Sequence, residues 1–216
     1  MAKAKKGAAL AEYHRRRDFS KTAEPRGGDS GSSGRPPSFV VQIHDATAMH
    51  FDFRLEVDGV LKSWAVPKGP SSDPHDKRLA MPTEDHPLEY REFEGEIAEG
   101  EYGAGTVIVW DEGTYRNLSA DRRGSEVPFE QALADGHASF WLDGHKLHGG
   151  WSLTRFRPGS GGQREAWLLV KRDDQRAHKD GGPDPRRARS VRTGHTLKQV
   201  STLKQVDKEQ AAGRKR

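Results

Sequence analysis

Side chains able to share one divalent cation stand close together in the sequence. His50 and Asp52 are separated by one residue, so in an extended strand they point to the same face, about 6–7 Å apart. A second imidazole could come from His44, six residues earlier, or from His86, after another short strand. Two imidazoles and one carboxylate suit Mn, Fe, Zn or Ni and leave positions open for substrate and water. We interpret this cluster as a candidate metal site.

Two cationic residues near this cluster could bind an anion beside the metal. Arg54 is the next residue along the face that carries His50 and Asp52. Lys68 follows in a loop, where it is either an anion contact or an ordinary surface lysine. The alternative for the whole row is a solvated strand face with a His–Asp–Arg charge ladder.

A β-hairpin must position these side chains. Apolar and polar residues alternate strictly over residues 50–57, which is typical of a half-buried strand. Asp58-Gly59 supplies the two residues that a type I′ turn needs, and residues 60–66 return. This turn fixes the register, so that Arg54 is expected opposite Ser63, with one apolar face on a core and the polar row on the other.

The remaining pattern predicts many short strands and one helix. Residues 111–113 resemble a turn between two strands, and the glycine-rich residues 94–105 resemble a set of tight turns. The single helix is expected at residues 128–134, where a proline stands in the first turn. Short, closely spaced strands predict an all-β, mainly antiparallel barrel or sandwich. Besides the hairpin, strands are expected at residues 39–43, 77–81, 106–110, 114–115, 137–142, 150–156 and 165–171.

Charge is unevenly distributed along the 216 residues. Residues 1–38 carry 9 Lys and Arg against 4 Asp and Glu, residues 39–170 carry 13 against 22, and residues 171–216 carry 14 against 6. An acidic centre with basic extensions is a layout for meeting nucleic acid through the ends of the chain. We expect a basic arm and flexible linker at 1–38, a folded domain at 39–172 and a disordered basic tail at 173–216.

The lack of cysteine and of long apolar segments excludes several classes of protein and of site. The chain has no cysteine, which excludes disulfides, thiolate zinc sites and a cysteine nucleophile. No apolar run approaches the roughly 20 residues that a membrane-spanning helix needs, and the N-terminus lacks the apolar segment of a secretory signal. We therefore expect a cytoplasmic protein that does not engage a membrane.

Several blocks together resemble a known family, the 3′-phosphoesterase domain of bacterial DNA ligase D and its stand-alone relatives. The resemblance covers roughly residues 17–172 and is specific because the blocks occur in order. It implies a small β-barrel and a Mn²⁺-dependent enzyme, with Co²⁺ or Zn²⁺ as other possible ions. The implied substrate is DNA whose 3′ end carries a ribonucleotide or a phosphate. The implied reactions remove the terminal ribonucleoside and then the 3′-phosphate, leaving a 3′-OH for ligation in end joining. The matching blocks lie at residues 39–46, 50–56, 61–70, 84–90 and 167–171.

The resemblance also implies roles for individual residues. It makes His44, His50 and Asp52 the metal ligands. The residues that it places on the scissile phosphate are Arg54 and His86, joined by Lys68, Arg78 and Tyr90. Residues of the same neighbourhood and of the N-terminal arm are Ser63, Glu84, Arg17, Asp18 and Glu24. Ala98 departs from the proline usual in its turn, a change expected to affect loop stiffness and not chemistry.

Two other functions fit parts of the pattern. A non-haem Fe(II) oxygenase on a β-barrel would use His50, Asp52 and His86 as a two-histidine, one-carboxylate triad. A non-catalytic nucleic-acid-binding module would bind DNA through its basic ends and keep the histidines as structural residues. For the enzyme we expect a monomer, with an end-joining ligase or polymerase protein as a possible partner.

Overall fold

The hairpin at the centre of the chain has the register that its turn predicts. In the computed structural model, which describes residues 7–28, 34–179 and 182–203, β2 (His50–Val57) pairs with β3 (Val60–Val66). Arg54 lies opposite Ser63, as expected. The turn residues Asp58 and Gly59 have φ angles of 50° and 80°. Both angles are positive, as a type I′ turn requires.

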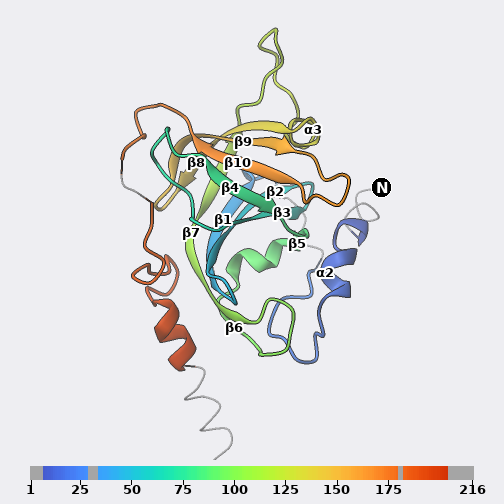
Figure 1. The fold of residues 1–216 in the computed structure, drawn as a ribbon, viewed down its shortest axis with the longest axis vertical. Coiled ribbons are helices and arrows are strands. Elements are labelled where there is room, and N and C mark those ends of the chain that lie inside the picture. Colours follow the sequence, from blue (N-terminus) through green and yellow to red (C-terminus); the bar gives the residue numbers. More distant parts are fainter. Residues whose placement is uncertain (1–6, 29–33, 180–181, 204–216) are drawn as a thin grey trace, which may run out of the picture.

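Eight antiparallel strands, including the two of this hairpin, close into a barrel (Figure 1). Their order around the ring is β1-β2-β3-β4-β10-β9-β8-β7, and β7 pairs with β1 to close it. The predicted all-β, antiparallel barrel is confirmed. The other six strands of the ring are β1 (Ser38–Asp45), β4 (Arg78–Pro82), β7 (Gly105–Asn117), β8 (His137–Gly144), β9 (His148–Arg157) and β10 (Ala166–Lys171).

Smaller elements surround the ring. Two short strands, β5 (His86–Pro87) and β6 (Gly95–Ile97), pair with β3 and β7. The predicted helix is present as α3 (Phe129–Ala134), and the structure adds α2 (Ala11–Arg15) and the 3₁₀ helix η1 (Leu88–Glu92). Along the described part of the chain, no helix combines the length and apolar character needed to cross a bilayer.

The turn expected at residues 111–113 is wrong, because β7 runs through it as one strand of 13 residues. The Asp111 carboxylate is fully buried and accepts the backbone N–H groups of the tight connection that follows β8. Gly113 lets β8 approach closely, since a Cβ there would lie 2.1 Å from the Asp143 carbonyl oxygen. Asp111 and Gly113 therefore allow neighbouring segments to pack closely and do not form a turn. Likewise, the expected set of tight turns at 94–105 contains the strand β6.

Both faces of the β1-β2-β3 region are buried, which explains why the polar row is not a solvated surface. Phe51, Phe53 and Leu55 of β2 face the barrel interior. A second apolar cluster covers the outer face, and it draws on the N-terminal arm and η1 as well as on the barrel. Its buried members are Tyr13, Val40, Leu61, Leu88, Tyr90, Phe93, Ile97, Val107 and Val109.

Part of the basic C-terminal segment packs on the barrel, whereas the sequence predicted a disordered tail from residue 173. Residues 197–203 are helical, and Leu197 and Val200 join the main core cluster with 6% and 8% exposure. Upstream, the Val191 backbone N–H donates to the Val109 carbonyl on β7. The expected disorder is therefore wrong for residues 182–203. Composition alone did not reveal that two apolar side chains, one helical turn apart, would be buried against the barrel. Residues 204–216 of the predicted tail and 29–33 of the predicted linker lie outside the described residues.

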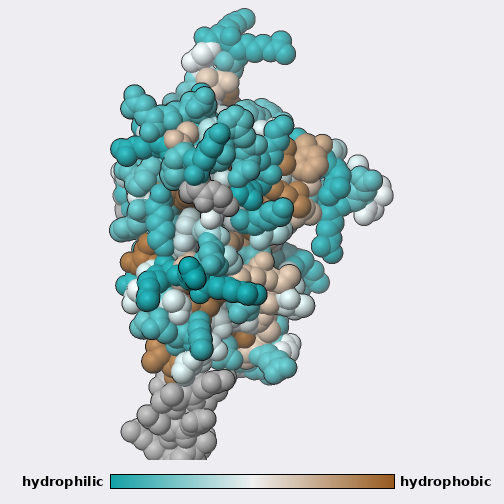
Figure 2. Space-filling view, turned by 60° about the vertical axis from the view of Figure 1, so that its left-hand side comes forward, coloured by the Kyte–Doolittle hydropathy of each residue, from teal (hydrophilic) through white to brown (hydrophobic). Residues whose placement is uncertain are grey.

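The face bearing this segment is mainly hydrophilic (Figure 2). Hydrophobic residues show there only in scattered patches, which is ordinary for the surface of a folded domain.

Docking of the C-terminal segment can be tested with its internal repeat. The sequence Thr-Leu-Lys-Gln-Val occurs at residues 196–200 and again at 202–206, which makes Leu203 a matched control for Leu197. Leu197 is 6% exposed and Leu203 is 51% exposed. Leu197→Ala should lower the free energy of unfolding by about 2 kcal/mol, since it opens a cavity at a packed site. Leu203→Ala should change it by less than about 0.5 kcal/mol. Chemical denaturation measures both, and equal effects would contradict the docking.

Candidate metal and phosphate site

Three side chains of β1 and β2 face one another at one end of the outer barrel face. His44 pairs with His50 across the two strands, and Asp52 lies on the same face. Their nitrogen and oxygen ligand atoms all lie within 4.8 Å of one another. The Asp52 Oδ2 is 3.6 Å from His44 Nδ1 and 3.7 Å from His50 Nε2. Ligands of one ion, at bonds of about 2.1 Å, stand roughly 3.0–3.4 Å apart, so a small adjustment would make these atoms co-ligands.

The second nitrogen of each imidazole is held by a backbone carbonyl. His44 Nε2 lies 2.8 Å from the Gly103 oxygen, and His50 Nδ1 lies 2.8 Å from the Ala48 oxygen. These contacts place the ring protons on those nitrogens, so that His44 Nδ1 and His50 Nε2 present lone pairs toward Asp52. Metal-ligating histidines are oriented in this way. The donor set therefore fits a divalent cation.

Arg54 connects this cluster to the rest of the site. Its Nη2 lies 3.1 Å from Asp52 Oδ2, and its Nε donates to Gln42 Oε1 at 2.8 Å. Its Nη1 donates to Ser63 Oγ at 2.8 Å and lies 3.0 Å from His86 Nδ1. Burial opposes ionisation of Asp52, but the Arg54 charge and the contacts of His44 and His50 together outweigh it and hold the pKa of that carboxyl below its usual range. Asp52 is therefore an ionised ligand at neutral pH.

His86 lies beside Arg54, buried under the N-terminal arm. Its Nδ1 lies 2.8 Å from the Glu84 carbonyl oxygen, and its Nε2 lies 3.3 Å from Arg17 Nη2. This pattern places the proton on Nδ1 and leaves Nε2 as an acceptor. Burial, followed by the positive charges of Arg54 and Arg17, lowers the pKa of His86 well below its usual value. The imidazole is therefore neutral at physiological pH.

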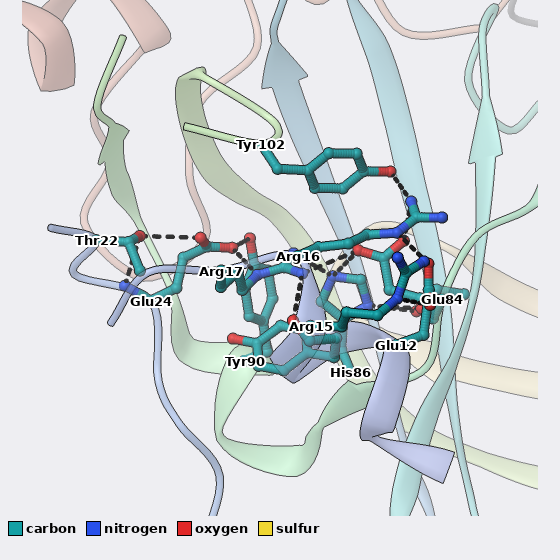
Figure 3. A network of polar contacts seen from close by, with 12 residues as sticks. Glu12, Arg15, Arg16, Arg17, Thr22, Glu24, Glu84, His86, Tyr90 and Tyr102 are labelled. Carbon is teal, nitrogen blue, oxygen red and sulfur yellow. Dashed lines mark hydrogen bonds and ion pairs between the residues drawn. The ribbon is translucent and has the colours of Figure 1, made fainter. Parts of the chain in front are cut away.

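The arm delivers Arg17 and Glu24 to the site (Figure 3). Arg17 donates to Glu24 Oε1 at 2.9 Å and to Glu84 Oε1 at 3.0 Å. The Tyr90 hydroxyl donates to the same Glu24 oxygen at 2.9 Å. Burial opposes the charged form of Arg17, but Glu24 outweighs it and raises the pKa. Burial and then Glu24 raise the pKa of Tyr90. The arm and the barrel thus share one buried charge network.

The other expected site residues lie at the edge of this network or outside it. Asp18 is exposed and closes a turn of the arm by accepting from the Ser20 N–H and hydroxyl. Lys68 is exposed in the loop after β3, beyond the end of the hairpin where His50 lies. Arg78 begins β4 and donates to Asp76 at 2.8 Å. None of these three makes a described contact with His86 or Asp52.

The sequence did not predict three residues of the site. Gln42 holds Arg54 and donates to the carbonyls of Tyr90 and Phe93, both at 3.0 Å. Tyr13 is fully buried, with its ring 3.8 Å from the Arg17 guanidinium carbon. Tyr102 lies in the loop after β6 and its hydroxyl contacts Arg16. A signal existed only for Gln42, a lone polar residue in the apolar run 39–43.

Comparison with known proteins gives a family and several relatives. Residues 42–155 match the family described as the DNA Ligase D 3′-phosphoesterase domain. The "Multifunctional non-homologous end joining protein LigD" of Pseudomonas aeruginosa is 51% identical over 173 residues, which is 78% of this chain and 19% of that protein. The "Multifunctional non-homologous end joining DNA repair protein LigD" of Mycobacterium tuberculosis is 42% identical over 170 residues, covering 79% and 20%. The chain thus spans about a fifth of the length of these relatives.

The metal cluster can be tested by binding alone. Asp52→Asn replaces a charged ligand by a neutral one, so Mn²⁺ affinity should fall by more than about a hundredfold. Asp143→Asn is the control, because Asp143 also lies near an imidazole, at 3.8 Å from His148, but is 78% exposed. Calorimetric titration with Mn²⁺ measures both variants. Equal affinities in the two would show that the cluster does not hold the ion.

The neutral state of His86 makes folding stability depend on pH. The unfolded imidazole takes up a proton below about pH 6.5 while the folded one does not, so stability falls as the pH falls from 7 to 5. The contribution of His86 to that loss is about 2 kcal/mol. His86→Gln should therefore show a smaller loss over this window in denaturation experiments. His75→Gln, at a side chain that is 83% exposed, should leave the loss unchanged.

Proposed function

The chain belongs to the DNA ligase D 3′-phosphoesterase domain family, and on this premise we propose that it is a metal-dependent hydrolase of DNA 3′ ends. It would remove a terminal ribonucleoside as a phosphodiesterase and then the remaining 3′-phosphate as a phosphomonoesterase. The observation that carries the proposal is the direct contact between a metal-ligand cluster and a buried guanidinium, Asp52 with Arg54 at 3.1 Å. A divalent ion and a guanidinium would both neutralise charge on a phosphate ester.

The metal would be held by His44 Nδ1, His50 Nε2 and an Asp52 oxygen. A divalent ion there, Mn²⁺ by family resemblance and Co²⁺ or Zn²⁺ as alternatives, would neutralise phosphoryl oxygens and lower the pKa of a coordinated water. Among the described residues that contact Asp52, only Arg54 carries a positive charge that does not depend on pH.

Arg54 would bind the scissile phosphate from a fixed position. Gln42, Ser63 and Asp52 hold the guanidinium on three sides, and Nη2 keeps donor capacity for a phosphate oxygen. Donors fixed before the substrate arrives stabilise the transition state without reorganisation. Lys68 and Arg78, which lie outside the buried network, would add charge at its rim and matter most for the phosphomonoester, which carries more negative charge than the diester.

His86 would bind phosphate or carry a proton to the leaving oxygen. In the free enzyme its pKa is low because of burial, Arg54 and Arg17. A phosphate placed near Nε2 would oppose the effect of both arginines and raise the pKa, so the imidazole would gain a proton only once substrate is present. Tyr90 and Glu24 would hold Arg17 in place, and the arm would close the site from above.

The biological setting follows from the relatives. Their names assign them to non-homologous end joining, and we propose that this chain prepares 3′ ends in the same process. An end-joining ligase or polymerase protein would then act on the 3′-OH. Against the oxygenase alternative stands the cationic environment of the cluster, since Arg54 and Arg17 favour a phosphate over dioxygen chemistry. The convergence of the His44, His50 and Asp52 ligand atoms within 4.8 Å supports a site over a purely structural role.

The activity is tested on a primer–template with a 3′-phosphate and on one with a 3′-terminal ribonucleotide. Wild-type protein should release phosphate from the first and a ribonucleoside from the second in Mn²⁺, and a chelator should stop both. His50→Ala should abolish both reactions, because it removes a metal ligand. His148→Ala, at a half-exposed surface histidine on β9, should retain both. Release that persists in the chelator would refute the proposal.

Lys68 separates the two reactions. Lys68→Ala should lower the phosphomonoesterase rate by at least tenfold and the phosphodiesterase rate by less than threefold, since a rim charge worth about 1.4 kcal/mol in the transition state gives a factor of ten. Lys77→Ala, a lysine nearby in sequence just before β4, is the control. An equal loss of both activities in the Lys68 variant would refute the division of roles.

A further inference from the structure

Tyr102 is an exposed aromatic side chain at the edge of the site that the catalytic proposal does not use. It is 46% exposed, whereas Tyr13 and Tyr90, the other tyrosines of this region, are buried. It lies in the loop between β6 and β7. The next residue, Gly103, holds the metal-ligand candidate His44 through its carbonyl oxygen at 2.8 Å. The loop is thus anchored directly beside the metal cluster.

Arg16 supports the Tyr102 ring from one side. The guanidinium carbon lies 4.6 Å from the ring centroid, and the arginine also donates to the Tyr102 hydroxyl. Arg16 is itself held by Glu12 and Glu84. In Figure 3 the Arg16 side chain runs along one side of the ring. The ring is held in place, and the 46% exposure of Tyr102 leaves part of it accessible.

The position of this ring relates it to the proposed phosphate site. The Arg17 guanidinium carbon lies 5.8 Å from the Tyr102 centroid, and the same guanidinium lies 3.3 Å from His86 Nε2. If the 3′-phosphate of a nucleotide is bound beside His86 and Arg54, its base would lie close to the Tyr102 ring. The adjacent Glu101 is paired with Lys21 at 3.8 Å. An accessible aromatic ring at this position fits a flat ligand such as a nucleobase.

We propose that Tyr102, backed by Arg16, is a stacking platform for the nucleobase at the 3′ end of the bound strand. The inference rests on the proposed function, because it names the part of the same substrate that this surface binds. Stacking of a base on an aromatic ring tolerates every base, so the platform recognises a terminal base without reading its identity. A cationic group behind the ring strengthens such a surface.

The test compares two primer–templates that both end in a 3′-phosphate. One carries adenine on its terminal nucleotide and the other is abasic there. Dissociation constants are measured by fluorescence anisotropy in a chelator, so that no turnover occurs. For wild-type protein the abasic end should bind about five- to a hundredfold more weakly, the range expected for one stacked base. Tyr102→Ala should bind both ends equally weakly. Because both dissociation constants are measured for the same variant, a loop change that weakens both complexes equally cancels in their ratio.

Two further variants separate stacking from a structural role. Tyr102→Phe keeps the ring and loses the hydroxyl contact to Arg16, so it should keep most of the wild-type ratio. Phe156→Ala removes an equally exposed aromatic (52%) on β9 and should leave the ratio unchanged. If Tyr102→Phe behaved like Tyr102→Ala, the hydroxyl would matter and the stacking platform would be overturned. A wild-type ratio near one would overturn it as well.

Failure of the platform and failure of the proposed activity give different results. If wild-type protein hydrolyses 3′-phosphate ends but Tyr102→Ala keeps the wild-type ratio, only the platform is wrong. If the ratio depends on Tyr102 but no phosphate is released in Mn²⁺, the base-binding surface stands and the hydrolase assignment is wrong. Mn²⁺ affinity, measured in parallel, should be unchanged in Tyr102→Phe, since Gly103 and not Tyr102 contacts His44.

Discussion

The buried Arg54 guanidinium is the interaction on which the rest of the site depends. It is 3% exposed, so its charge must be met by protein groups, and Asp52, Gln42 and Ser63 meet it. A buried charge without partners is strongly destabilising. These partners therefore constrain one another, and the metal cluster at one end of the outer barrel face cannot shift independently of His86 at the other. The Arg54 charge helps to lower the pKa of Asp52, and burial together with the same charge lowers the pKa of His86.

The barrel supplies only half of this site. Its outer face carries Arg54 and the metal cluster, but Arg17 and Glu24 come from an arm that precedes the first strand. The arm is held by Tyr13, which is fully buried and donates its hydroxyl proton to the Pro25 carbonyl at 2.6 Å. Buried ion pairs of this kind contribute little net stability, because desolvation offsets the attraction. Their effect is to fix positions, which suits the proposed binding of a phosphate by these charges.

Identical residues behave differently in this fold when their neighbours differ. Leu197 and Leu203 occupy the same place in the two copies of a five-residue repeat, yet the first is buried and the second is exposed. Asp111 and Gly113 resemble a turn in sequence but lie within a strand, since three backbone N–H groups meet the carboxylate and a neighbouring strand fills the space beside the glycine. The deciding partner in each case is remote in the chain. Local propensity does not contain it.

The sequence by itself determined the hairpin, its register and the face that carries His50, Asp52 and Arg54. Strand periodicity and a two-residue turn are local properties, and the turn at Asp58-Gly59 allows only one register. Tertiary structure decided which second imidazole joins the candidate metal cluster. It is His44 and not His86, because β1 pairs beside β2 and brings His44 opposite His50, while His86 lies beside Arg54 and Arg17. Tertiary structure also decided that the polar face is buried, since that depends on an arm and a 3₁₀ helix distant in sequence, and chain packing alone brings them together.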